Sequence, residues 1–429
     1  MRAITAEPVA ADARARRVRR RLPPQNHHAF QGSRTSAIAL GLSFAIAWLG
    51  LTPVALANNA LAELGRSLFF DVNLSLERTQ SCASCHQHTH ALRDGRENRV
   101  GGASSIGSDG HSLGDRNTPS IAYANRVPEL YREADGRYRG GLFHDGRARN
   151  LVDQAAEPFL NPLEMAMPDR ASVVRRVREQ PHYTSRFEDL FGSDIFDDGE
   201  RVYRALTEAI ATFERSTDFA PFDSRYDRYL RGEYRMSTQE ELGRRLFFTD
   251  LTNCMNCHLL EANSEKTLEP FSDFRYHNIG LPINQALRSS NETARTFIDA
   301  GLAASPHVEH PAAERGKFRT PSLRNVAVTA PYMHNGVFAK LETAIAFYNQ
   351  YIVVNPQAAV NPETGSDWGA PEIEENIATD LLSKGQPLDD QRIAALVAFL
   401  RTLTDRRYEH LLPENAEGDL EFPNETQQR

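Results

Sequence analysis

Residues 82–86 read "CASCH" and residues 254–258 read "CMNCH". The 429-residue chain has four cysteines, and all of them lie in these two motifs. In a CxxCH motif, one helical turn brings two thiols and an imidazole to one haem edge, where the thiols bond the vinyl groups and the imidazole coordinates iron. A redox dithiol or a zinc site is the alternative, but zinc needs more ligands than either motif offers. We therefore predict two covalent c-type haems. Their ligands are Cys82, Cys85 and His86 for the first haem and Cys254, Cys257 and His258 for the second.

The two motifs lie in two copies of one longer unit. "AELGRSLFF" (62–70) precedes the first motif and "EELGRRLFF" (240–248) precedes the second. After the motifs come, in the same order, "NTPSIAYAN" (117–125) and "RTPSLRNVA" (319–327), then "FHDGRARNL" (143–151) and "MHNGVFAKL" (333–341). A repeat of this length indicates a duplicated domain.

Apolar residues recur mostly at helical spacing, and strand-like alternation is scarce. Val202, Leu206, Ile210 and Phe213 form one such series, and Ile393, Leu396 and Leu400 form another. We predict a mainly all-α fold, a tandem of two c-type cytochrome domains with one covalent haem each. The N-terminal domain would span residues 58–230 and the C-terminal domain residues 231–429, since the charged stretch 224–238 ends where the second repeat begins.

The first 57 residues differ from the rest in composition. Arginines precede an apolar run at residues 36–54, and small residues follow at Ala55 and Ala57. This pattern predicts a signal peptide at residues 1–57, cleaved after Ala57, and a periplasmic enzyme; an uncleaved membrane anchor is the alternative. The segment holds eight of the 49 basic and two of the 57 acidic residues, so the mature chain has a net charge near −14. Such a charge argues against nucleic acid and suits a basic protein partner.

The repeat is asymmetric where a ligand could approach the haem. With His144 aligned on His334, Tyr348 corresponds to Pro158. In the same register, Gln154 and Glu164 correspond to apolar residues, Ala344 and Val354. A phenol can bind ferric iron, and a carboxylate can act as acid and base. The first haem is therefore expected to do chemistry and the second to store or relay electrons.

At these residues the mature chain resembles the bacterial dihaem cytochrome c peroxidase and MauG superfamily, most distinctly in "FRTPSLRNVAVTAPYMHNGVF" (318–338). The resemblance implies that the first haem binds hydrogen peroxide and that Gln154, Pro158 and Glu164 line its distal pocket. Glu164 would take a proton from peroxide and return it to the leaving oxygen.

The resemblance also implies two metal-ligand sets. A calcium ion would be bound by Asn117 and by the backbone carbonyls of Thr329 and Pro331. Tyr348 would be the distal ligand of the second haem, as in MauG, where other peroxidases of the superfamily have methionine. Met333 is the alternative ligand. His111 is a candidate distal ligand of the first haem, although it lies two residues closer to the Arg116–Asn117 pair than expected.

Two functions remain open. One is reduction of hydrogen peroxide to water with electrons from a small c-type cytochrome or cupredoxin; the other is MauG-like oxidation of tryptophan in a partner protein. Tyr348 favours the second, but His144 and Thr252 stand where relatives have the tryptophans that carry charge between the haems and towards a partner. We therefore favour peroxide reduction over protein modification or a non-catalytic electron shuttle, with His144 at the inter-haem position. The sequence indicates no oligomeric state.

Overall fold

The computed structural model describes residues 53–260, 267–290, 297–352 and 359–413. Leu51–Arg429 form one compact unit. The expected signal peptide lies outside the described residues except for 53–57, which form the start of helix α1. No helix within the described ranges is long and apolar enough to cross a membrane.

Helices dominate the fold, and the strands have two residues each. The helices of the first half are α1 (Pro53–Phe69), α2 (Cys82–Cys85), α3 (Leu151–Ala156), α4 (Arg170–Arg178), α5 (Pro181–Phe191) and α6 (Gly199–Glu214). Those that follow are α7 (Arg225–Leu230), α8 (Thr238–Phe247), α9 (Met255–His258), α10 (Gln285–Ser290), α11 (Pro311–Glu314), α12 (Leu341–Ala346), α13 (Asn349–Ile352), α14 (Thr379–Leu382) and α15 (Asp390–Arg401). The antiparallel strand pairs are β1 (Tyr131–Arg132) with β2 (Tyr138–Arg139), and β3 (Tyr276–His277) with β4 (Phe318–Arg319). The prediction of a mainly α-helical fold is confirmed.

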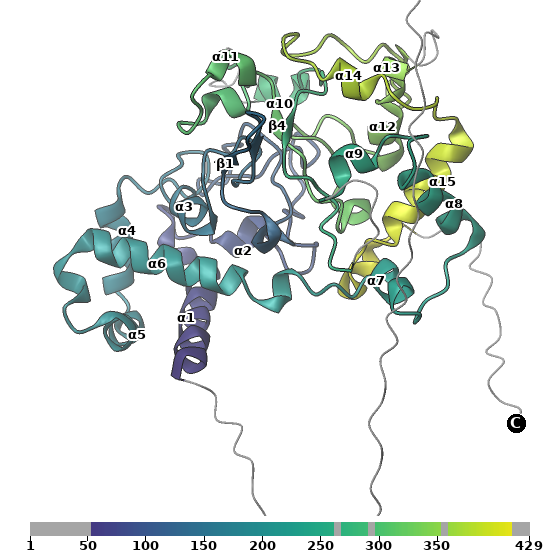
Figure 1. The fold of residues 1–429 in the computed structure, drawn as a ribbon. Coiled ribbons are helices and arrows are strands. Elements are labelled where there is room, and N and C mark those ends of the chain that lie inside the picture. The colour runs from purple at the N-terminus through teal and green to yellow at the C-terminus, as the bar shows by residue number, and fades with distance from the viewer. Residues whose placement is uncertain (1–52, 261–266, 291–296, 353–358, 414–429) are drawn as a thin grey trace, which may run out of the picture. The chain divides into compact units, whose positions relative to one another are not determined.

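The same pair of crossing helices occurs in each half. Helix α1 packs on α6, and α8 packs on α15 (Figure 1). Glycine permits both contacts: a Cβ atom on Gly65 would lie 1.8 Å from the carbonyl oxygen of Ala209, and one on Gly243 would lie 1.8 Å from that of Ala395. The shared "LG" of the repeats therefore marks the closest approach of two helices.

The loops between these helices repeat as well. Tyr123 and Asn325, which correspond in the repeat, both have φ 62° and ψ 10°. The turns around His144 and His334 close with equivalent bridges, Leu142 to Ala148 and Tyr332 to Phe338.

Two large hydrophobic clusters lie on either side of residue 223. The first contains the predicted series Val202, Leu206, Ile210 and Phe213 of α6, and the second is built around α8 and α15. Tyr226 of α7 packs in the second cluster, so the two cores divide before α7, several residues earlier than the expected boundary at residue 230.

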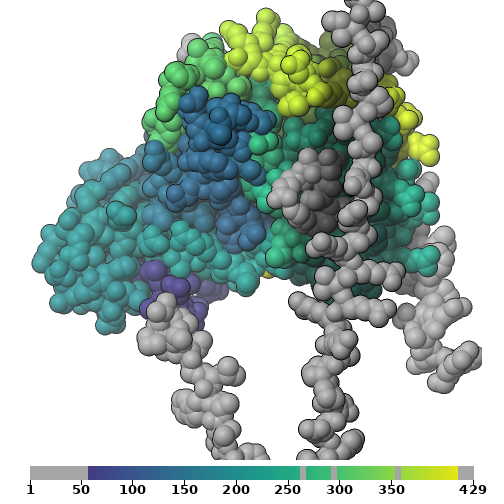
Figure 2. Space-filling view, viewed as in Figure 1, coloured from purple at the N-terminus to yellow at the C-terminus, as the bar shows by residue number. Residues whose placement is uncertain are grey.

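The halves contact each other through their repeated loops. The amide of Asn117 donates to the His334 carbonyl at 2.8 Å, and the amide of Arg319, its counterpart, donates to the His144 carbonyl at 2.8 Å. A further bridge joins Arg139 to Arg275, and in Figure 2 the blue surface of the first half adjoins the green surface of the second half. Each half thus supplies a loop that binds the histidine turn of the other.

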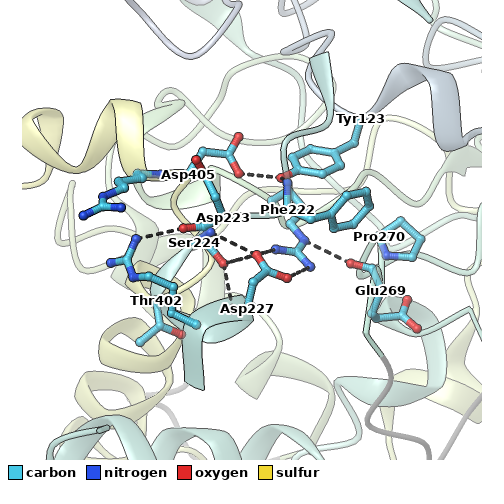
Figure 3. A network of polar contacts seen from close by, with 12 residues as sticks. Tyr123, Phe222, Asp223, Ser224, Asp227, Glu269, Pro270, Thr402 and Asp405 are labelled. Atoms are coloured by element: carbon cyan, nitrogen blue, oxygen red, sulfur yellow. Dashed lines mark hydrogen bonds and ion pairs between the residues drawn. The ribbon is translucent and has the colours of Figure 1, made fainter. Parts of the chain in front are cut away.

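A buried ion pair joins Arg324 to Asp227 of α7, close to the contact between the two halves. The Arg324 guanidinium donates to both carboxylate oxygens of Asp227, at 2.5 and 2.9 Å, and to the Glu269 carbonyl at 2.9 Å. Nearby, the Tyr123 hydroxyl donates to Asp405 (Figure 3). Since Tyr123 belongs to the first repeat and the other four residues follow residue 223, polar contacts as well as packing join the halves.

Candidate haem sites

The first CxxCH motif forms a single helical turn. Ser81 precedes α2, and its side chain takes part in a capping box with Ser84. The Cys85 sulfur accepts hydrogen bonds from Gln80 at 2.9 Å and Arg96 at 3.3 Å. Cys82 and Cys85 are free thiols, as are Cys254 and Cys257 of the second motif. All the cysteines are therefore available for thioether bonds.

The two motif histidines are held in the same way. His86 Nδ1 donates to the Leu92 carbonyl at 3.1 Å, and His258 Nδ1 donates to the Phe271 carbonyl at 3.3 Å. Burial lowers the pKa of both imidazoles, which keeps them neutral. A hydrogen bond from Nδ1 to a carbonyl fixes the tautomer that presents Nε2 to a metal. Both sites therefore fit a haem with an axial histidine.

The same carbonyls bind the loops that cross between the halves. Leu92 also accepts from the Ile121 amide at 3.2 Å, and Phe271 from the Leu323 amide at 3.3 Å. Ile121 and Leu323 are equivalent residues of the repeated "TPS" loops. Each loop thus supports the motif histidine of its own half and binds the histidine turn of the other half.

Glu164 lies beside the first motif, close enough to Cys82 to act on its charge. Its carboxylate accepts a hydrogen bond from Asn161 at 2.7 Å. Burial raises the pKa of this carboxyl, opposed by the positive charge of Arg147. Pro158 is in the same turn, where its carbonyl accepts from the Met165 amide at 3.2 Å, and Gln154 lies on α3 just before it. An acid with a raised pKa suits proton exchange near neutral pH.

Tyr348 lies beside the second motif, between α12 and α13. Burial raises the pKa of its phenol, and Cys257 and Cys254 act in the same direction. The alternative ligand, Met333, packs against the second hydrophobic cluster. Val354, the residue that corresponds to Glu164, lies outside the described residues.

The histidines of the crossed turns are buried between the halves. His144 Nε2 donates to the Asn117 carbonyl at 2.9 Å, and burial together with Arg116 lowers the pKa of the imidazole to about 4. His334 stacks on Phe318 with ring centroids 3.5 Å apart. Both imidazoles are therefore neutral at physiological pH.

Thr252, the other residue in a tryptophan position, is buried. Its hydroxyl donates to the Leu246 carbonyl at 2.7 Å. Its polar group therefore serves the local turn before the second motif.

His111 is held by its own turn. Its side chain is 79% exposed, and its two ring nitrogens lie 2.9 Å from the Asp109 carbonyl and 3.3 Å from the Asp109 carboxylate. This arrangement argues against a distal-ligand role.

Asn117, Thr329 and Pro331 lie near the crossing of the halves. The Asn117 amide binds His334, three residues after Pro331. In the part of the chain that the structure describes, the Thr329 and Pro331 carbonyls accept no hydrogen bond. Over the same residues, no cluster of three or more His, Cys, Asp or Glu side chains could hold a metal ion.

Sequence reasoning missed two parts of these sites. The carbonyls of Leu92 and Phe271 carry no signal, because every residue has a carbonyl group. The second part that the sequence did not reveal is Glu214, a buried acid whose charge acts on Cys82. Comparing α6 with α15 in the repeat would have revealed it, since its counterpart is Leu400.

Known proteins are similar to this chain over most of its length. The model of the di-haem cytochrome c peroxidase family matches residues 59–235. The methylamine utilization protein MauG of Paracoccus denitrificans is 52% identical over 359 residues, which cover 84% of this chain and 92% of that protein. The cytochrome c551 peroxidase of Nitrosomonas europaea is 32% identical over 67% of this chain and 72% of its own length. The crystal structure of the diheme peroxidase BthA from Burkholderia thailandensis matches with a TM-score of 0.72 at 33% identity, covering 83% of this chain and 89% of that one.

Proposed function

Because the chain belongs to the di-haem cytochrome c peroxidase family, we propose that it reduces hydrogen peroxide to water at its first haem site. Members of this family are haem oxidoreductases with two c-type cytochrome domains. We assign the first haem to Cys82, Cys85 and His86, and the second to Cys254, Cys257 and His258. The supporting observation is the asymmetry of the two sites, with a buried carboxyl beside Cys82 and a phenol beside the second pair of cysteines.

At the first site, the bound haem supplies an iron that binds peroxide and passes electrons to it. Glu164 would accept a proton from bound peroxide and return it to the departing oxygen, which would leave as water. Burial keeps the pKa of Glu164 raised, so that the carboxyl can both gain and lose this proton. Asn161 orients the carboxylate through its 2.7 Å hydrogen bond. Gln154 and Pro158 would line the same pocket beside the bound haem, and neither side chain would be an iron ligand.

At the second site, we assign Tyr348 as the distal ligand. A phenolate ligand stabilises ferric iron, which suits a haem that delivers electrons to the first site. His144 lies at the contact of the halves, where its neutral imidazole donates to the Asn117 carbonyl and its backbone carbonyl accepts from the Arg319 amide. We place calcium on Asn117 and the carbonyls of Thr329 and Pro331, since oxygen ligands suit this cation.

The electron donor would be a small c-type cytochrome or cupredoxin of the periplasm. The acidic mature chain favours a basic donor. The predicted signal peptide supports export.

A second function, MauG-like oxidation of tryptophan in a partner protein, is favoured by Tyr348 and by the 52% identity to the Paracoccus protein. His144 and Thr252 argue against it, because neither side chain is as readily oxidised as an indole. Peroxide reduction is therefore the better-supported function.

The experiment is a turnover assay on the dihaem-loaded protein, with peroxide and a reduced small cytochrome or cupredoxin. We expect rapid oxidation of the donor with stoichiometric loss of peroxide. If peroxide oxidises the protein but no small donor reduces it again, peroxide reduction is rejected. That result would support oxidation of tryptophan in a partner protein instead. Resting-state EPR tests the site assignment separately, because two low-spin ferric signals would contradict an open first haem.

A further inference from the structure

Helices α6 and α15 are equivalent, and one buried carboxyl of α6 has an apolar counterpart on α15. Gly65 contacts Ala209 on α6 as Gly243 contacts Ala395 on α15, which fixes the register between the two helices. In this register, Glu214 corresponds to Leu400. Both side chains are buried, with exposed fractions of 6% and 5%. The first half therefore carries a carboxyl where the second half has an apolar side chain.

The Glu214 carboxyl lacks the partners that a buried charge needs. Its Oε2 atom is buried and has no hydrogen-bond partner within the described structure. Burial raises the pKa of Glu214 to about 8, and the positive charge of Arg215 opposes the shift. A buried carboxylate without hydrogen bonds is costly, so the group holds a proton at neutral pH.

Glu214 lies close to the first haem motif. It is the strongest charged influence on Cys82, whose thiol pKa is raised by burial and then by this carboxyl. Cys82 would carry one thioether of the first haem. The carboxyl is therefore close enough to respond to a change of charge at that haem.

Charged residues on the helices packed against α6 do not change the pKa of Glu214. The elements packed on α6 are α1, α3, α4, α5 and the short helix Ile195–Asp197. Their charged residues are Glu63, Arg66, Asp153, Arg170, Arg175, Arg176, Arg178, Arg186, Glu188, Asp189 and Asp197. Among the described residues, only Arg215 contributes a resolved charge effect on Glu214.

We propose that Glu214 is a proton-coupled residue of the first haem, which in alkaline solution takes up one proton when that haem gains one electron. This inference rests on the proposed function, which puts a haem on Cys82. The electron comes from the protein donor, and the proton comes from solvent and converts the Glu214 carboxylate into a carboxylic acid. Oxidation of the haem releases both. The proton neutralises the charge that the electron brings into the buried site.

The test is an EPR-monitored redox titration of the holoprotein at several pH values, which follows the two ferric haems separately. In the native protein, we expect the potential of the first haem to fall as pH rises through the region near 8 where Glu214 titrates. The steepest fall expected is a tenfold change of the redox equilibrium per pH unit, which lowers the potential of a one-electron couple by about 59 mV. In Glu214→Gln this pH-dependent component should disappear, and the potential should stay at its low-pH value. The second haem should titrate alike in both proteins.

Glu200→Gln is the matched control, because it removes an acid from the same helix whose side chain is 66% exposed and pairs with Arg170, away from Arg215. It should leave the pH dependence unchanged. If Glu214→Gln keeps the native pH dependence, the inference is overturned.

Should Glu214→Gln fail to fold, infrared difference spectroscopy of the native holoprotein gives a second test. Reduction at pH 9 should produce the carbonyl band of a newly protonated carboxyl group, and its absence would overturn the inference. Absence of covalent haem on Cys82 would instead refute the proposed function.

Discussion

Glu164 and Glu214 are two buried acids beside the same cysteine, and the proposals give them different tasks. Glu164 lies in the turn after α3 with Asn161 as its partner, which suits a group that must face substrate. Glu214 lies on α6, and its Oε2 atom has no partner in the described structure. Only Glu164 should therefore affect the chemical step directly.

Replacing Glu164 with Gln should lower turnover with peroxide by about 10²- to 10⁴-fold, because the amide cannot shuttle the proton. Haem content should not change. The measurement is steady-state kcat with a reduced small cytochrome. Asp153→Asn is the control, since Asp153 is an exposed acid on α3 in the same segment. Equal losses in the two variants would contradict the assignment of Glu164.

Replacing Tyr348 with Met should raise the reduction potential of the second haem, because a thioether ligand favours ferrous iron more than a phenolate does. Potentiometric titration of the holoprotein measures the shift. Tyr351→Phe is the control, since the Tyr351 hydroxyl donates to the Ile279 carbonyl at 2.8 Å. An unchanged potential in Tyr348→Met would rule out Tyr348 as the ligand.

His144→Trp tests the inter-haem position. An indole loses an electron more readily than an imidazole, so the variant should transfer electrons between the haems faster. Rapid mixing with peroxide, followed at the absorption bands of each haem, gives the rate. His144→Phe should not show the acceleration. If His144→Trp also keeps the native rate, the position has no special electronic role.

At the scale of elements, the crossings of α1 with α6 and of α8 with α15 depend on glycine. Gly65→Ala should destabilise the holoprotein by about 1–3 kcal/mol, because its Cβ would overlap the Ala209 carbonyl and force the helices apart. Gly243→Ala should behave alike. Urea unfolding measures both. Gly199→Ala on α6 is the control, since a Cβ there meets nothing within 4 Å. The packing argument fails if Gly65→Ala is as stable as this control.

The sequence predicts an element well when particular side chains form its contacts, and poorly when backbone groups form them. The repeated "LGR" and "TPS" segments are visible because they require particular residues, and the α6 series is visible because burial repeats at helical spacing. The crossing of the loops, from Asn117 to His334 and from Arg319 to His144, was not predictable. It uses backbone amides and carbonyls, which every sequence provides. The expected boundary at residue 230 differs from the division of the cores, because the charged stretch that suggested it contains Tyr226, which packs in the second core.

At the scale of the whole molecule, the two halves are joined where Arg324 and Asp227 form their buried pair. The side chains are 0% and 4% exposed. The Arg324 guanidinium also lies 5.3 Å from the ring centroid of Tyr123, which belongs to the first repeat. Arg324 immediately follows Leu323, whose amide binds the Phe271 carbonyl, so the Arg324–Asp227 pair also lies beside the contact that holds the second motif histidine.

Arg324→Met should therefore destabilise the holoprotein by about 3–5 kcal/mol, because it leaves the Asp227 carboxylate buried without its partner. The loss should appear as a lower urea midpoint. The double variant Arg324→Met with Asp227→Leu should recover most of it, since no buried charge remains. Arg392→Met is the control: its pair with Asp389 is exposed and 3.9 Å long, so removing it should change stability by less than about 1 kcal/mol. A single Arg324→Met variant as stable as the double variant would mean that the unpaired Asp227 carboxylate does not destabilise the fold.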